Sequence, residues 1–109
     1  MRRWINPGAK FLAHVPLFDP ETGVTVREPL GEGPGWWAGA PSALYDASTG
    51  HFYLYYRYRK PRELGRGVEC RIARSWDGLH FEDIWAATKE QINTQSMEKA
   101  CLIKAGDDL

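Results

Sequence analysis

Guanidinium groups are the most distinctive chemical feature of this sequence. Arg57 and Arg59 end a run rich in aromatic residues, and Arg71 lies two residues after Glu69. A guanidinium presents a rigid fork of donors that fits carboxylates, phosphates and sugar hydroxyls. We therefore consider Arg57, Arg71 and Glu69 as substrate-binding residues. The alternative is a structural ion pair in which Arg57 or Arg71 contacts Glu69 across adjacent strands.

Tryptophan residues are the second group of candidates. The chain has five Trp and five Tyr. Such a density is typical either of a β-rich core with cross-strand aromatic pairs or of a surface that stacks on flat ligands such as sugar rings. Trp36 and Trp37 are adjacent, so in a strand their side chains point to opposite faces. We consider either of them as a sugar-stacking residue, with core packing as the alternative.

Other familiar reaction centres are not indicated. His14, His51 and His80 are far apart and lack the spacing of zinc ligands, so we expect no metal site and no cofactor. Ser42 does not lie in the G-x-S-x-G pattern of a nucleophile elbow. The glycine-rich residues 31–35 lack the Lys-Ser/Thr of a phosphate-binding loop, and we interpret them as a tight turn before a strand.

Length and charge narrow the class of protein. The 109 residues suffice for one small domain, and 14 basic residues balance 14 acidic ones, which argues against a nucleic-acid-coating or membrane-surface protein. No apolar run approaches the roughly 20 residues of a membrane-spanning helix, and the N-terminus lacks the apolar region of a signal peptide. Cys70 and Cys101 are too few for a disulfide framework, and we interpret them as buried free thiols of a cytoplasmic protein.

The middle of the chain predicts an all-β fold. Alternating and aromatic-rich runs between turn signals predict strands at residues 38–45, 51–58, 68–75 and 81–85. Asp46 and Asp77 lie in the first and last connections, where Asp side chains typically bond to their own backbone. These short connections predict a four-stranded antiparallel meander. An unbroken two-residue period places Val68 on the face of Cys70, and Asp83 on the face of Trp85.

The two ends of the chain predict less regular structure. Glycine and proline punctuate residues 1–34, which we expect to form an irregular leader with a short strand near residues 24–27. Residues 86–96 are polar and indicate a connection. Residues 97–109 contain an apolar piece that predicts a fifth strand before the turn signal Gly106-Asp107-Asp108.

A weak internal repeat links the first and fifth predicted strands. Ala43-Leu44-Tyr45-Asp46 aligns with Cys101-Leu102-Ile103-Lys104, and a glycine-containing turn follows each segment. A four-stranded unit followed by the start of another is the pattern that radial repetition of small sheets produces, as in a β-propeller.

Three motifs in this order resemble five-bladed β-propeller proteins related to glycoside hydrolase family 43 and to the mannoside phosphorylases of family 130. The first is A-P-S-A-L-Y-D, followed after a turn by F-Y-L-Y-Y-R, at residues 40–46 and 52–57. The second is S-W-D-G-L-H-F at residues 75–81, and the third is S-M-E-K-A-C-L at residues 96–102. The resemblance covers residues 35–109 and implies a propeller fold.

The resemblance also implies a truncated domain. Residues 35–85 correspond to a first blade, residues 86–96 to a connection and residues 97–109 to the start of a second blade, after the leader of residues 1–34. An open arc leaves strand edges unpaired, and a chain of this length buries little surface. We therefore expect missing C-terminal blades or a self-association partner.

A glycoside site is the functional implication of the resemblance. Glycoside hydrolysis needs an acid and a base or nucleophile on either side of the glycosidic bond. In relatives of family 43 the first blade supplies an Asp directly before a Pro, whereas this chain has Ala40-Pro41. The internal repeat places Glu98 at the equivalent position in the second blade, which makes it the candidate catalytic residue. The alternative is a surface carboxylate before a strand, paired with Lys99 or with solvent. In phosphorylase-like relatives, arginines at the end of the strand that corresponds to residues 51–58 help to bind phosphate, which implies that role for Arg57.

The expected function is therefore a glycoside hydrolase or glycoside phosphorylase that acts on oligosaccharides. The expected substrate-binding residues are Trp36, Trp37, Arg57, Arg71 and Glu69. Because position 40 lacks an Asp, a non-catalytic carbohydrate-binding propeller is one alternative. A structural β-meander that serves as an interaction module is the other, and neither nucleic acid nor a membrane is an expected partner.

Overall fold

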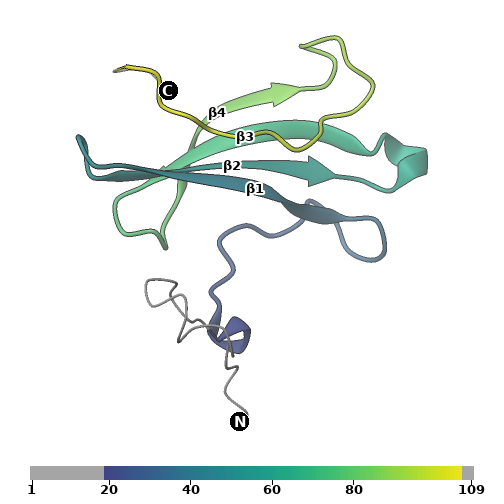
Figure 1. Ribbon diagram of the computed structural model, residues 1–109. Coiled ribbons are helices and arrows are strands. Elements are labelled where there is room, and N and C mark those ends of the chain that lie inside the picture. Colours follow the sequence, from purple (N-terminus) through teal and green to yellow (C-terminus); the bar gives the residue numbers. More distant parts are fainter. Residues whose placement is uncertain (1–18, 107–109) are drawn as a thin grey trace, which may run out of the picture.

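The computed structural model describes residues 19–106, which fold around one antiparallel β-sheet. Its strands are β1 (Trp37–Asp46), β2 (His51–Arg59), β3 (Gly67–Ser75) and β4 (Glu82–Thr88), hydrogen-bonded in the order β1-β2-β3-β4. Two short 3₁₀ turns, η1 (Pro20–Thr22) and η2 (Arg62–Leu64), lie outside the sheet (Figure 1). The predicted four-stranded meander is confirmed, although β4 extends into the predicted connection.

Side chains of the turn residues fix the first and the last of the three hairpins. Asp46 Oδ1 accepts hydrogen bonds from the backbone N–H and the hydroxyl of Ser48 at 3.0 and 2.7 Å. Gly50, at the end of this turn, has a φ of 77°, which glycine adopts without strain. In the β3–β4 connection, Asp77 Oδ1 accepts a hydrogen bond from the N–H of His80 at 2.8 Å. These contacts confirm the turn roles predicted for Asp46 and Asp77.

A β-bulge in β4 changes the faces that its side chains occupy. Ile72 pairs with Trp85, but the following Ala73 pairs with Asp83, so that Ile84 is an extra residue. An extra residue reverses the alternation of side chains beyond it. Asp83 and Trp85 therefore lie on opposite faces, and the prediction that they share one is wrong.

A second bulge lies at the start of β3. Tyr58 pairs with Glu69, whereas Arg59 pairs with Gly67, which leaves Val68 without a partner position. Val68 packs against the buried cluster that contains Tyr58, not on the face of Cys70. The prediction that Val68 shares a face with Cys70 is therefore wrong, because this bulge, like the one in β4, reverses the alternation of side chains.

The sheet has two faces, which we call upper and lower as they lie in Figure 1. Residues 96–104, which we call the strap, cross the upper face, and part of the N-terminal segment runs below the lower face (Figure 1). The buried cluster of the upper face consists of Tyr55, Cys70, Ala87 and Met97. The buried cluster of the lower face consists of Tyr56, Tyr58 and Ala73. The core is therefore split between two thin layers.

The strap replaces the predicted fifth strand. No strand is assigned to residues 97–104 or to residues 24–27. The backbone N–H of Met97 donates to Gly67 O at 2.8 Å, but the N–H of Leu102 donates to Ser42 Oγ at 2.9 Å. Because a side chain takes the place of a backbone partner, no ladder forms. Part of the predicted turn at positions 106–108 lies outside the described residues, as do residues 1–18 of the leader.

A network of ionic and hydrogen bonds fastens the N-terminal segment to the lower face. Arg27 donates to Asp83 Oδ1 at 2.8 Å and to the hydroxyl of Tyr56 at 2.9 Å. Tyr56 in turn donates to Asp83 at 2.7 Å, and Arg71 donates to Asp83 Oδ2 at 2.9 Å. Burial opposes ionisation of Asp83, but these donors outweigh it and hold its pKa below the usual value. Asp83 is thus the ionised centre of the network.

Replacing Asp83 tests the weight of this network. We expect Asp83→Asn to lower the free energy of unfolding by about 1–3 kcal/mol at pH 7, because two partly buried guanidinium groups lose their shared carboxylate. Since the folded pKa of Asp83 is depressed, its contribution is present above about pH 4 and is lost as pH falls through the folded pKa. Urea unfolding at pH 7 and pH 3, followed by tryptophan fluorescence, measures both effects. The exposed neighbour Glu82→Gln is the control, and equal losses in the two variants would contradict the assignment.

Candidate functional site

Arg57 lies where the sheet and the strap meet on the upper face. Its side chain is only 10% exposed, and Nη1 donates to the backbone carbonyl of Met97 and to Glu98 Oε2, the latter at 3.1 Å. The guanidinium carbon lies 4.7 Å from the centre of the Trp37 ring. Three groups that are distant in sequence, on β1, β2 and the strap, therefore converge on one guanidinium.

Glu98 is held as an ionised and accessible carboxylate. Its side chain is 63% exposed. A hydrogen bond from Ser96, followed by the charges of Arg57, Arg66 and Arg59, holds its pKa below the usual value. A carboxyl group with a lowered pKa is suited to act as a base, a nucleophile or a partner for a cation, and not as a general acid near neutral pH.

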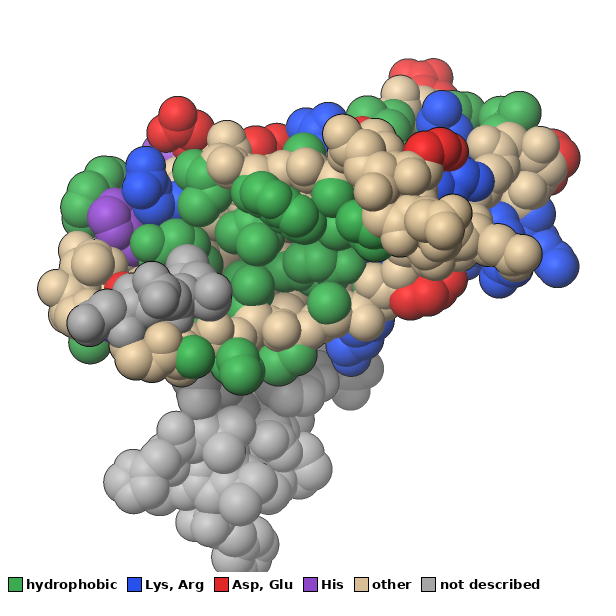
Figure 2. Space-filling view, turned by 90° about the horizontal axis from the view of Figure 1, so that it is seen from above, with side chains coloured by type: hydrophobic (Ala, Val, Ile, Leu, Met, Phe, Trp, Pro, Cys, Tyr) green, Lys and Arg blue, Asp and Glu red, His purple; other side chains and the backbone are tan. Residues whose placement is uncertain are grey.

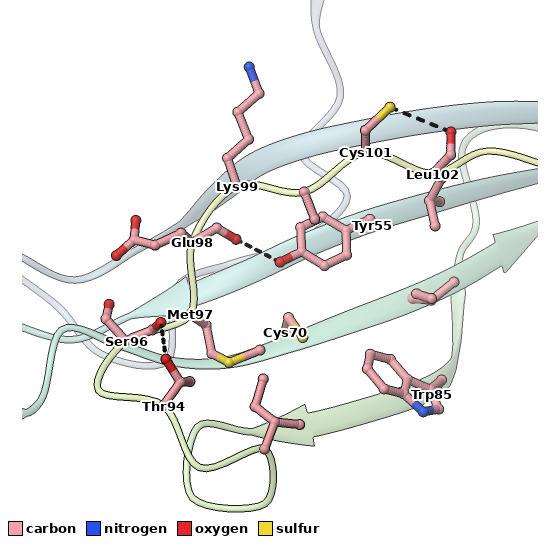
Figure 3. Close-up of a pocket in the computed structure, with 13 residues that line it drawn as sticks. Tyr55, Cys70, Trp85, Thr94, Ser96, Met97, Glu98, Lys99, Cys101 and Leu102 are labelled. Carbon is pink, nitrogen blue, oxygen red and sulfur yellow. Dashed lines mark hydrogen bonds between the residues drawn. The ribbon is translucent and has the colours of Figure 1, made fainter.

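The backbone of Glu98 is fixed from below by Tyr55. The phenol donates to the carbonyl oxygen of Glu98 at 2.8 Å, as Figure 3 shows. Burial is the main cause that raises the pKa of Tyr55 to about 12, so the hydroxyl remains a donor at neutral pH. Gly67 supports the same segment, because its carbonyl accepts the N–H of Met97 and its N–H donates to Ser96 Oγ at 3.3 Å.

Positive charge exceeds negative charge around Glu98. The Nε atoms of Arg57 and Arg59 are buried and have no hydrogen-bond partner among the described residues. Arg59 also lies over Trp37, at 5.6 Å from the ring centre. Arg66 has a φ of 62°, which is uncommon for a residue other than glycine, asparagine or aspartate. Three arginines thus surround one carboxylate, which favours an additional anionic group.

Glycine makes room for the indole of Trp37. Gly39 pairs with Arg57 across the β1–β2 ladder, and a Cβ at position 39 would lie 3.1 Å from the Trp37 ring. The next residue, Ala40, has a φ of 53° and belongs to an irregularity in β1 between Gly39 and Ser42. Position 40, which follows the ladder partner of Arg57, carries only a methyl group.

Trp36 is directed away from this cluster. Its six-membered ring lies against Gly31, where a Cβ would come within 2.6–2.8 Å of the ring carbons. Together with residues 28–33, Trp36 lines a separate hollow of about 520 Å³. The two adjacent indoles diverge as expected, and of the two only Trp37 lies beside Arg57, the partner of Glu98.

Arg71 and Glu69 lie on the lower face, on the other side of the sheet from Arg57. Arg71 Nε donates to Glu69 Oε2 at 3.2 Å, and its guanidinium lies 5.0 Å from the Tyr58 ring centre. This agrees with the ion-pair alternative for Arg71, although the two residues belong to one strand. Arg57 pairs with Glu98 and not with Glu69. The structure therefore does not bring Arg71 and Glu69 into the same site as Glu98.

An apolar hollow of about 400 Å³ lies between the strap and β4. Figure 2 shows hydrophobic side chains gathered over the middle of the upper face. Figure 3 shows the carboxylate of Glu98 and the ammonium of Lys99 directed away from Tyr55 and Trp85, which line the hollow. The alternative pairing of Glu98 with Lys99 is therefore not found. The ionic groups lie at the rim, and the floor of the hollow is apolar.

Both cysteines are free, and both line this hollow. Cys70 is buried, and burial is the main cause that raises the pKa of its thiol, so Cys70 is expected to be unreactive. Cys101 is exposed on the strap, so the prediction of a buried thiol holds for Cys70 alone.

Within residues 19–106, no group of three or more His, Cys, Asp or Glu side chains could hold a metal ion. In the same part of the chain, no helix is long and apolar enough to cross a membrane.

Sequence reasoning missed several members of the Arg57 cluster. They are Gly39, Tyr55, Arg66, Gly67 and Ser96. Of these residues, only Arg66 has a signal in the sequence, because it follows Gly65 in a basic, glycine-containing loop. Comparison of the chain with protein-family models, with curated proteins and with solved structures finds no match. The site must therefore be interpreted from its own geometry.

The pKa of Glu98 reports on this geometry. We expect Arg57→Gln and Ser96→Ala each to raise it toward the ordinary value of about 4.3, because each removes a group that stabilises the carboxylate. Carbon-detected NMR titration of the Glu98 carboxyl measures the change. Lys99→Gln is the matched control, since Lys99 adjoins Glu98 but its side chain is directed away. A larger shift in the Lys99 variant would refute the arrangement.

Gly67 is the position at which a small change should displace the strap. A Cβ there would lie 2.8 Å from Ser96 Oγ and 2.9 Å from Arg57 Nη1, and closer still to the carbonyl oxygen of Met97. We expect Gly67→Ala to increase hydrogen exchange of residues 96–104 by at least about tenfold, with little change in β2. Unchanged exchange in the strap, measured by mass spectrometry, would show that it is not seated on Gly67.

Proposed function

We propose that this chain is the N-terminal part of a carbohydrate-active β-propeller, a glycoside hydrolase or a glycoside phosphorylase that acts on oligosaccharides. The observation that carries the proposal is the convergence of Glu98, Arg57 and Trp37 on one face of the sheet. A carboxylate, a fork of donors and a flat apolar ring are the groups that recognise a sugar and act on its glycosidic bond.

In this proposal each member of the cluster has a separate role. Glu98 acts as the base or nucleophile, because neighbouring donors and cations hold its pKa below the usual value. Trp37 offers its ring to the apolar side of a sugar, and Arg57 orients the carboxylate. Cleavage also needs an acid on the other side of the bond. In the proposed propeller, a carboxyl group on a further blade supplies this acid.

The proposed blade arrangement draws support from the strap. Lys104 Nζ binds Asp46 Oδ1 at 2.9 Å, and these residues are partners in the internal repeat. The chain thus returns from β4, at one edge of the sheet, to the neighbourhood of β1 at the other edge. A second blade that begins there would cover the apolar middle of the upper face, where Trp85 is 49% exposed. Self-association through this face is the alternative way to cover it.

Phosphorolysis is favoured over hydrolysis by the charge of the site. Arg57, Arg59 and Arg66 surround a single carboxylate, and position 40 lacks the Asp of family 43 relatives. An inorganic phosphate beside Glu98 would satisfy the excess positive charge and could serve as the attacking group. The same missing Asp keeps non-catalytic oligosaccharide binding as the second candidate. Free cysteines, one of them exposed, favour a reducing cytoplasmic location.

Substitution of Glu98 tests the proposal. In the full-length protein that carries the further blades, we expect Glu98→Gln to reduce turnover of manno- and xylo-oligosaccharides by at least about 10³-fold, because it removes the ionised group without changing its size. Release of free sugar and of sugar 1-phosphate, measured with and without inorganic phosphate, separates hydrolysis from phosphorolysis. Glu90→Gln, an exposed glutamate outside the cluster, is the control. Turnover that survives in the Glu98 variant would exclude Glu98 as catalytic, and binding without turnover in the unmodified protein would favour the second candidate.

A further inference from the structure

Trp76 is the most exposed large hydrophobic side chain among the described residues, at 70%. It lies at the opposite end of the upper face from Glu98, because it stacks on His51 at the start of β2, whereas Glu98 contacts Arg57 near its end. Six residues of strand separate His51 from Arg57, which corresponds to about 20 Å. Neither the proposed active site nor the packing of the core accounts for this indole.

The ring of Trp76 is held in one orientation. Its centre lies 3.5 Å from that of the buried His51 ring, with an interplanar angle of 35°, so one face of the indole is covered and the other is open. The backbone on either side is fixed by Ser75, whose hydroxyl accepts the N–H of Gly78 at 2.9 Å and donates to Asp77 at 2.9 Å. A ligand that stacks on this ring therefore meets a preorganised surface.

Polar groups lie along the same end of the face. Asp46 pairs with His51 in the β1–β2 ladder, and Lys104 Nζ binds Asp46 at 2.9 Å and Ser48 Oγ at 2.8 Å. Gly50, at the end of this turn, approaches Trp76, since a Cβ there would lie 3.9 Å from the ring. Figure 2 shows hydrophobic, basic, acidic and histidine side chains gathered at this end of the upper face. A flat apolar surface thus has hydroxyl, ammonium and carboxylate groups nearby.

We propose that Trp76 is a stacking surface for a sugar ring of a polysaccharide, a second carbohydrate site about 20 Å from Glu98. The choice of a carbohydrate rests on the proposed function. A pyranose has an apolar C–H face and a polar hydroxyl edge, which match the open indole face and the neighbouring polar groups. A protein partner fits less well, because stable interfaces bury about 800 Å² on each side and charged groups flank this indole.

Affinity electrophoresis of the full chain tests this site. The probes are soluble galactomannan and arabinoxylan, each cast into a native gel, with a gel lacking polysaccharide as reference. We expect retardation in at least one of the two, a loss of affinity of at least about tenfold for Trp76→Ala, and near-normal retardation for Trp76→Phe, which keeps an aromatic face. Trp85→Ala is the matched control, because Trp85 is a half-exposed indole on the same face.

Several outcomes would overturn the inference. They are the absence of retardation in both gels, normal retardation of Trp76→Ala, a loss in Trp76→Phe as large as in Trp76→Ala, and an equal loss in Trp85→Ala. Circular dichroism of each variant confirms that it is folded. Glu98→Gln should be retarded like the unmodified protein. Retardation of the chain, combined with no turnover by the full-length protein that carries the further blades, would remove the enzymatic proposal and leave this site standing, whereas turnover without retardation would do the reverse.

Discussion

The guanidinium of Arg57 is the contact on which the arrangement of the upper face depends. It rises from a central strand, is almost fully buried, and bonds to two consecutive residues of the strap. A buried charge without its partners is strongly destabilising, so the strap and the sheet require each other at this point. The position of Glu98 and the contact with Trp37 follow from this contact, which also adds to the hydrogen bond from Ser96 in lowering the pKa of Glu98.

The strands could be predicted from the sequence because their signals are local. Aromatic runs, the Asp46 turn and the Asp77 turn each act within a few residues, and the structure keeps all of them. The bulges at Val68 and Ile84 could not be predicted, because a bulge is defined by the pairing of two strands and not by the period of either. The prediction of a fifth strand was wrong, because no pattern in residues 97–104 reveals that one of its backbone N–H groups donates to a serine hydroxyl.

The candidate site was also hard to predict, because its residues are distant from one another in the sequence. Glu98 and Arg57 are far apart in sequence, and only a resemblance to known proteins indicated that they belong together. Arg71 carries the same functional group as Arg57, yet it faces the opposite way because Arg57 pairs with Cys70. A difference of one residue in register thus separates the arginine that holds the strap from the arginine that braces the N-terminal segment.

The strap has a thermodynamic consequence that follows from its irregular backbone. It is held by a few separate contacts, at Gly67, Tyr55, Ser42 and Asp46, and not by a continuous ladder. Segments of this kind open at a lower free-energy cost than the strands beneath them. The carboxylate can therefore leave the guanidinium while the sheet stays folded, and on heating the contact between Arg57 and Glu98 would be lost before the protein melts.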